Sequence, residues 1–141
     1  MRFWVSNETH SCGLDLDGEP VDLTLGGLGD DILDELESCM RQDAWDGRAP
    51  DGSRWASLRQ STVKHKGSST PGIVTGNMFG GLENGRRRVD PRSLSWTHPD
   101  AGSGKLSGFH NGNPRTGQPA RRLIGWSDRA KDYARRAVEG G

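Results

Sequence analysis

Apolar side chains recur at helical spacing in two places, one near each end of the chain. The first is a helix predicted over residues 30–42. Its apolar face begins just before it at Leu28 and continues at Ile32, Leu33, Leu36, Cys39 and Met40. Aspartates at its start and an arginine at its end complement the helix dipole. Ser127 is a good N-cap for a second helix over 127–139. The apolar face of that helix consists of Ala130, Tyr133, Ala134, Ala137 and Val138.

Alternation of apolar and polar residues predicts strands between and before these helices. Phe3 and Val5 indicate a short strand within residues 1–7. Leucines at period two on both sides of residues 17–20 indicate a strand pair joined there (Leu14, Leu16, Leu23 and Leu25). Residues 92–98 read as a strand, 105–109 as its partner, and 100–104 as the turn between them. The predicted fold class is α+β: two main helices packed on a small antiparallel sheet, with a long ordered loop between the first helix and the strands.

The chain is short and poor in large apolar residues. Its 141 residues suit one domain, and Leu, Ile, Val and Phe together number 24. A share this low indicates disorder only when the net charge is high, and here the formal net charge is zero. We therefore expect a folded but core-poor domain that gains stability by burying surface against neighbours. Residues 1–27 are assigned to an acidic leader that includes the strand pair, and residues 28–141 to the main domain.

A long turn-rich segment follows the first predicted helix, from Trp45 to about residue 72. Pro50, Asp51 and Gly52 predict a turn, because Pro fixes φ, Asp bonds its own backbone and Gly accepts a positive φ. Trp45 and Trp55 flank the turn, and a disordered linker rarely carries two tryptophans this close. We predict an ordered loop with both indoles as packing anchors. It is either a binding surface or a surface loop pinned to its own core.

Two ordered blocks of residues carry a resemblance. The first is P-D-G-x-x-W-x-x-L, then a Thr, a Lys, an apolar pair and T-G-x-M, formed by Pro50, Gly52, Trp55, Leu58, Thr62, Lys66, Ile73, Val74, Thr75, Gly76 and Met78. The second is an aromatic–His–x-Gly cluster, then P-A-R, an apolar run and a helix-opening Ser, formed by Phe109, His110, Gly112, Pro119, Ala120, Arg121, Leu123, Ile124 and Ser127. In this order and rough spacing, with the helix before them, residues 28–139 resemble the virion-morphogenesis or tail-completion family of Mu-like and P2-like tailed phages.

The resemblance implies a structural virion protein of the neck or tail terminus that acts in tail completion or head–tail joining. It implies no catalytic role, synthesis and assembly in the host cytoplasm, and a homo-oligomeric ring, sixfold like phage tails, that contacts adjoining neck or tail proteins. On the resemblance, one set of residues would shape the fold and its contacts: Trp45, Pro50, Gly52, Trp55, Leu58, Thr62, Lys66, Gly76, His110, Pro119, Ala120 and Arg121. Arg121 would donate either to a carboxylate within the fold or to a neighbouring subunit.

The formal charge is zero overall but unevenly distributed. Residues 1–52 carry a net charge of −10 and residues 53–141 a net charge of +10. The two parts either fold against each other or meet between subunits, as a heterologous contact that closes into a ring.

An arginine cluster lies in the basic part of the chain, at Arg86, Arg87, Arg88 and Arg92. These side chains either keep a loop or strand edge soluble or contact phosphate backbones without sequence readout. In a phage neck they would face the passing DNA if they point into the ring. A non-sequence-specific DNA-binding protein that uses the basic half is therefore the alternative function.

No pattern in the sequence indicates an enzyme, a cofactor or a metal. His10 and Cys12 are close in sequence, but no further ligand falls at zinc spacing, and His98 and His110 are isolated. The G-S-G-K run at 102–105 lacks the context of a phosphate loop, and no nucleophile elbow is present. Cys12 and Cys39 are expected to be reduced thiols, with Cys39 in the core. We expect neither a signal peptide nor a membrane span.

Overall fold

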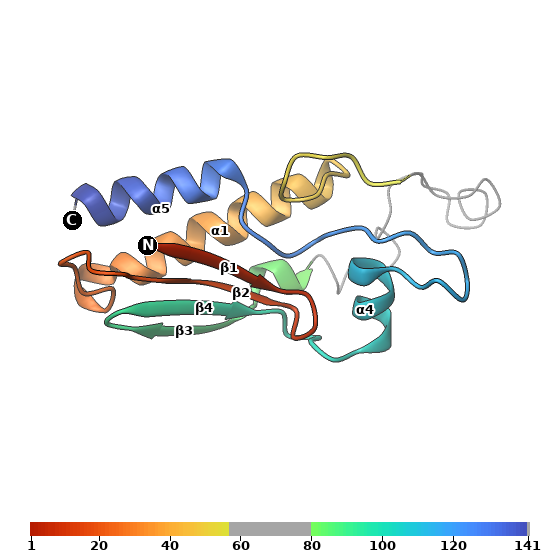
Figure 1. Cartoon of the computed structure of the whole chain (residues 1–141), viewed down its shortest axis with the longest axis horizontal. Coiled ribbons are helices and arrows are strands. Elements are labelled where there is room, and N and C mark those ends of the chain that lie inside the picture. The colour runs from red at the N-terminus through yellow and green to blue at the C-terminus, as the bar shows by residue number, and fades with distance from the viewer. Residues whose placement is uncertain (57–79, 141) are drawn as a thin grey trace.

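The computed structural model describes residues 1–56 and 80–140. A four-stranded antiparallel sheet and two long helices form two layers (Figure 1), which confirms the predicted α+β class. In chain order the elements are β1 (Arg2–Ser6), β2 (Ser11–Asp15), the 3-10 helix η1 (Leu25–Gly27), α1 (Leu28–Trp45), the 3-10 helix η2 (Gly81–Glu83), β3 (Arg86–Asp90), β4 (Ser93–Thr97), α4 (Gly104–Asn111) and α5 (Asp128–Gly140). No helix in these ranges is long and apolar enough to cross a membrane.

The strand order is β1-β2-β4-β3, so the sheet consists of two hairpins joined through β2 and β4. Leu14 of β2 pairs with Phe3 of β1 on one side and with Leu94 of β4 on the other. Side chains alternate between the two faces of a sheet, and the face toward α1 and α5 carries the buried Cys12, Leu14, Leu94 and Trp96. The predicted strands within 1–7 and 92–98 are confirmed.

The predicted strand pair around residues 17–20 is wrong. β2 pairs with β1 and β4, and residues 21–25 form no strand. Leu23 is nevertheless buried, because the loop places it against the core, where its N–H donates to the Pro91 carbonyl at 3.1 Å. Leu25 begins η1 and is 67% exposed. Two leucines at period two are too short a pattern to separate a strand from a loop that leads into a helix.

Residues 105–109 belong to a helix, not to a strand. Ser103 is the N-cap of α4, and its Oγ accepts from the Leu106 N–H at 3.2 Å. Leu106, Phe109 and His110 are buried at i, i+3 and i+4 spacing. β4 pairs instead with β2 and β3, and Arg87 of β3 lies opposite Trp96.

α1 and α5 lie side by side over one face of the sheet (Figure 1). Both predicted helices are confirmed, and α1 continues three residues beyond the predicted end. Ser127 caps α5, because its Oγ accepts from the Ala130 N–H at 3.2 Å. Just before the cap, the Trp126 indole N–H donates to the Gly13 carbonyl at 2.9 Å, and its ring meets Phe3 edge-on at 4.8 Å. These contacts fix the start of α5 on β1 and β2.

A buried carboxylate connects α1 with β3 and β4. Glu37 accepts from the Trp96 indole N–H at 2.9 Å and from the Gly85 N–H at 3.3 Å, and it forms an ion pair with Arg87. Arg87 also contacts Asp34 of α1 at 2.7 Å. The acidic stripe of α1 therefore neutralises an arginine of β3, so part of the charge asymmetry is resolved within one chain.

Candidate functional site

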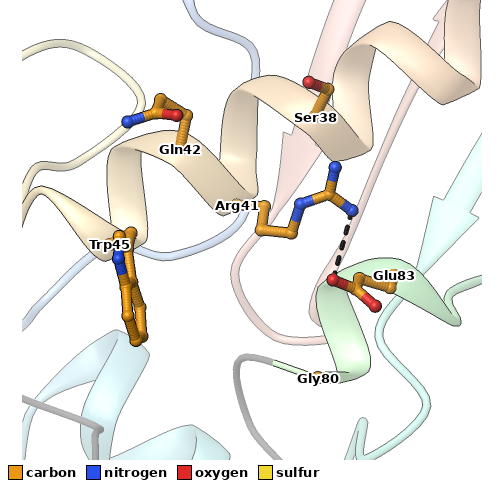
Figure 2. Close-up of a pocket in the computed structure, with 6 residues that line it drawn as sticks. All are labelled: Ser38, Arg41, Gln42, Trp45, Gly80 and Glu83. Carbon is orange, nitrogen blue, oxygen red and sulfur yellow. Dashed lines mark ion pairs between the residues drawn. The ribbon is translucent and has the colours of Figure 1, made fainter.

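A hollow of about 370 Å³ lies between the C-terminal end of α1 and η2 (Figure 2). Its lining residues are Ser38, Arg41, Gln42, Trp45, Gly80 and Glu83. Arg41 reaches across from α1 and forms an ion pair with Glu83 at 3.4 Å. The Trp45 indole projects from the last turn of α1 beside this pair, and the residue is 63% exposed.

Trp45 is exposed because α1 continues as far as this residue. It follows Arg41 by four residues and Ser38 by seven, which places all three on the solvent side of the helix. Trp45 is therefore not buried in the core, unlike Trp55. Within residues 1–56 and 80–140 the large exposed apolar side chains are those of Val5, Leu25 and Trp45. Among these Trp45 is the one aromatic residue.

Trp55, the other predicted anchor, is buried. Its ring meets Phe109 of α4 edge-on at 5.1 Å, and its indole N–H donates to the Arg122 carbonyl at 2.8 Å. These contacts hold the segment after α1 against α4 and against the chain that leads to α5, so this prediction is confirmed.

The predicted turn at residues 50–52 is also confirmed. The Gly52 N–H donates to the Ala49 carbonyl at 2.9 Å, and Gly52 has a φ of +91°. Asp51 accepts from the Ser53 N–H at 2.8 Å through its side chain. Pro50 is half-buried and approaches Gly125, so the turn is anchored on one side.

The second resembling block forms part of the core and part of the surface. His110 is fully buried, and Arg121 is 5% exposed. Arg121 donates from Nε to the Ala56 carbonyl at 3.1 Å, and its guanidinium lies 5.9 Å from the centre of the Phe109 ring. One acceptor of Arg121 is thus a backbone carbonyl of the same chain. Pro119 and Ala120 are exposed. Leu58, Thr62, Lys66 and Gly76 lie outside the described residues.

The arginine cluster is divided by the alternation of β3. Arg87 faces α1, where its ion pairs form. Arg86 and Arg88 are exposed and project from the opposite face, where Arg88 contacts Asp90 at 3.1 Å. Arg92 donates to the carbonyls of Glu19 and Val21. Two of the four predicted DNA-facing residues therefore stabilise the fold.

Three buried histidines meet where the β1–β2 turn, the end of β4 and α4 come together. This histidine cluster consists of His10, His98 and His110. The rings of His10 and His110 are 5.7 Å apart, and the His98 N–H donates to the His10 carbonyl at 3.0 Å. His98 and His110 look isolated in the sequence, because no local pattern brings them together with His10, which lies almost 90 positions before His98.

Desolvation disfavours the protonated form of two of these rings, those of His10 and His110. Burial, with the positive charges of Arg122, His10 and His98, lowers the pKa of His110 to about 4. Burial and the charge of His98 also lower the pKa of His10. The rings of His10 and His110 are therefore neutral near pH 7.

The described residues offer little for metal or thiol chemistry. No group of three or more His, Cys, Asp or Glu within them is placed to hold a metal ion. Cys12 and Cys39 are free and buried, and burial raises the pKa of both thiols, which makes them poor nucleophiles. Comparison of this chain with models of protein families, with curated proteins and with solved structures gives no match.

Proposed function

We propose that this chain is a structural protein of a tailed-phage virion, acting in tail completion or head–tail joining as a subunit of a homo-oligomeric ring. The observation that carries the proposal is the exposed Trp45 beside the hollow at the end of α1. Tryptophan is enriched among the residues that dominate binding energy at protein interfaces. Together with the two resembling blocks, this exposure supports a role in assembly.

A ring requires two different surfaces on each subunit, because a heterologous contact joins one patch to another. α1 presents an exposed apolar side chain near each end: Leu25 lies in η1 just before it, and Trp45 is its last residue. The helix rises about 27 Å over its 18 residues, so the two patches are well separated. In the proposed ring, the Trp45 hollow of one subunit meets the Leu25 end of the next.

The biological role is tested by deleting the gene from the phage that encodes it and imaging the lysate by negative-stain microscopy. Filled heads beside separate tails are the expected result. Joined and infectious particles would exclude the role in completion or joining.

The geometry of the ring is tested with purified Trp45→Ala and Leu25→Ala chains by native mass spectrometry. We expect each variant alone to lose the higher oligomers of the unaltered chain. An equimolar mixture should form a one-to-one dimer, because one intact Trp45 surface and one intact Leu25 surface remain. Val5→Ala is the matched control, since it trims another exposed apolar side chain. A Leu25→Ala chain that still self-associates would exclude the heterologous contact.

Non-sequence-specific DNA binding is the second candidate, favoured by the exposed Arg86 and Arg88 on the sheet face opposite α1. Binding driven by contacts with the DNA phosphates weakens steeply as the salt concentration rises, because the release of counterions from the DNA then gains less entropy. Retention of duplex DNA by the purified chain near physiological salt, lost in an Arg86→Ala/Arg88→Ala double variant, would support it. Absence of retention would exclude it.

A further inference from the structure

The histidine cluster forms hydrogen bonds that require neutral rings. His110 Nδ1 accepts from the Leu123 N–H at 3.0 Å, and His98 Nδ1 accepts from the Asp100 N–H at 3.0 Å. His10 Nδ1 accepts from the Gly102 N–H at 3.4 Å. A ring nitrogen that accepts from an amide carries no hydrogen, so each ring is held as the Nε2–H tautomer.

The bonds of His110 connect three separate parts of the chain. Its Nδ1 reaches the segment at residues 121–126, which leads to α5, and its Nε2 contacts Asn7 Oδ1 of the β1–β2 turn at 2.8 Å. His110 itself is in the last turn of α4. His10 connects the same β1–β2 turn to the residues that precede α4. The cluster therefore holds α4 and residues 121–126 against the turn.

Protonation would oppose these bonds directly. A proton on Nδ1 of His110 would face the Leu123 N–H, and a buried imidazolium would lie 5.7 Å from the His10 ring. His10 already has a buried Nε2 with no partner among the described residues, and its φ of +51° is uncommon outside glycine. The cluster thus has little capacity to stabilise an added charge.

The charged groups around the cluster do not offset that cost. Arg122, in the 121–126 segment, raises the positive potential at His110, as do the other two rings when protonated. Of the acidic residues on the adjoining elements, Glu8 of the β1–β2 turn, Asp100 before α4 and Glu83 of η2 are all exposed, as is Lys105 of α4. Arg121 is buried but donates toward Ala56.

We propose that the histidine cluster is an acid-sensitive latch: protonation of His10 and His110 releases α4 and residues 121–126 from the β1–β2 turn, while α1, α5 and the sheet stay folded. Release also frees Phe109 from Trp55, and so loosens the segment that follows α1. This device is independent of the proposed function.

The direction and size of the effect follow from linkage. The pKa of His110 is about 4 when latched, and a released ring has its ordinary value near 6.5. Lowering the pH from 7.5 to 5 therefore increases the opening equilibrium about 30-fold through His110 alone. His10 adds to this change in the same direction.

Amide hydrogen exchange measured by NMR on the whole chain tests the latch. After correction for intrinsic exchange rates, protection of the Leu123 and Gly102 amides should fall at least tenfold between pH 7.5 and 5. Amides bonded between β2 and β4 serve as internal controls and should change little. Long-range 1H–15N spectra at pH 7.5 should show the Nε2–H tautomer for all three rings.

A His10→Asn/His110→Asn variant supplies the matched control. Asparagine Oδ1 lies near the position of Nδ1 and accepts a hydrogen bond, but it does not titrate, and asparagine tolerates the positive φ of residue 10. Protection at Leu123 should become independent of pH in this variant. The latch is refuted if the original chain loses protection uniformly, if its rings titrate near 6.5 without local opening, or if the variant keeps the same pH dependence. The first two of these outcomes are measured on the original chain, so they test the latch even if the variant does not fold.

Discussion

At the scale of single residues, Glu37 is a buried polar group that connects α1 with the sheet. It is 5% exposed and meets Trp96, Gly85 and Arg87. Glu37→Ala leaves the Trp96 N–H unsatisfied and Arg87 with fewer acceptors, so the free energy of unfolding should fall by about 3–5 kcal/mol. Glu83→Ala removes an exposed partner of Arg41 and should cost less than about 1 kcal/mol. Urea denaturation followed by tryptophan fluorescence measures both, and equal losses would contradict this assignment.

Gly13 is a second residue whose identity the sheet requires. A Cβ there would lie 2.4 Å from the Leu94 carbonyl oxygen and 2.5 Å from the Trp4 indole, which rests on this glycine. Gly13→Ala should therefore lower the free energy of unfolding by about 1–3 kcal/mol. Gly80→Ala is the control, because no atom lies within 4 Å of its added Cβ and its φ is −59°. Thermal unfolding of the two variants should separate them clearly; similar melting temperatures would show that β1 and β2 adjust freely.

At the scale of elements, serine caps define where both C-terminal helices begin. Ser103→Ala and Ser127→Ala each remove one side-chain acceptor and should each lower the free energy of unfolding by about 1 kcal/mol. The loss at Ser103 should be accompanied by faster amide exchange in α4, and the loss at Ser127 by faster exchange in α5. Exchange that rises equally in both helices would contradict local capping. Ser53→Ala, at an exposed turn, controls for removal of a hydroxyl.

The elements that could be predicted from the sequence are those with long periodic patterns. The helices α1 and α5 have 18 and 13 residues, enough to reveal their apolar faces. α4 has 8 residues, and its cap at Ser103 is followed by apolar residues that also fit an alternating pattern. Trp45 was misplaced because the helix was predicted to end at residue 42. Continuing the pattern by one turn would have placed Trp45 on the polar stripe with Arg41.

At the scale of the whole molecule, the pH dependence of stability follows from several titratable groups together. The pKa values of His10 and His110 are lowered by burial. Their contribution to the free energy of unfolding is therefore complete above about pH 6.5 and is lost as the pH falls toward 4. Between its folded and unfolded pKa values, each such histidine changes the free energy of unfolding by roughly 1.4 kcal/mol per pH unit. The half-buried carboxylate of Glu19, whose pKa is lowered to about 2 by its hydrogen bond with the N-terminal amine, acts in the same direction below its ordinary range.

Alkaline pH destabilises the chain through the thiols. Burial raises the pKa of Cys12, so the unfolded chain loses this proton first and stability falls above about pH 8.5. The free energy of unfolding should therefore be greatest between about pH 6.5 and 8.5. Chemical denaturation at a series of pH values measures this profile. A Cys12→Ala variant should show a smaller alkaline decline, with the remainder due to Cys39, and an unchanged decline would assign it to other groups.

The candidate sites could be predicted only in part, because they depend on contacts between distant residues. The turn at residues 50–52 and the burial of Trp55 follow from local chemistry and were predicted. The sequence did not predict that Arg87 faces α1 while Arg86 and Arg88 face away from it, because the register of β3 decides which side chain meets α1. The histidine cluster likewise results from pairing β2 with β4. No local pattern encodes that pairing.

The pairing of β2 with β4 also has a consequence for synthesis on the ribosome. Asp15 at the end of β2 and Ser93 at the start of β4 are paired but lie 78 positions apart. At roughly 5–20 residues per second, translation separates their emergence by about 4–16 s. Throughout that interval the first hairpin has an unpaired inner edge that carries Cys12 and Leu14. Nascent chains of this protein are thus expected to need a chaperone until the second hairpin has been translated.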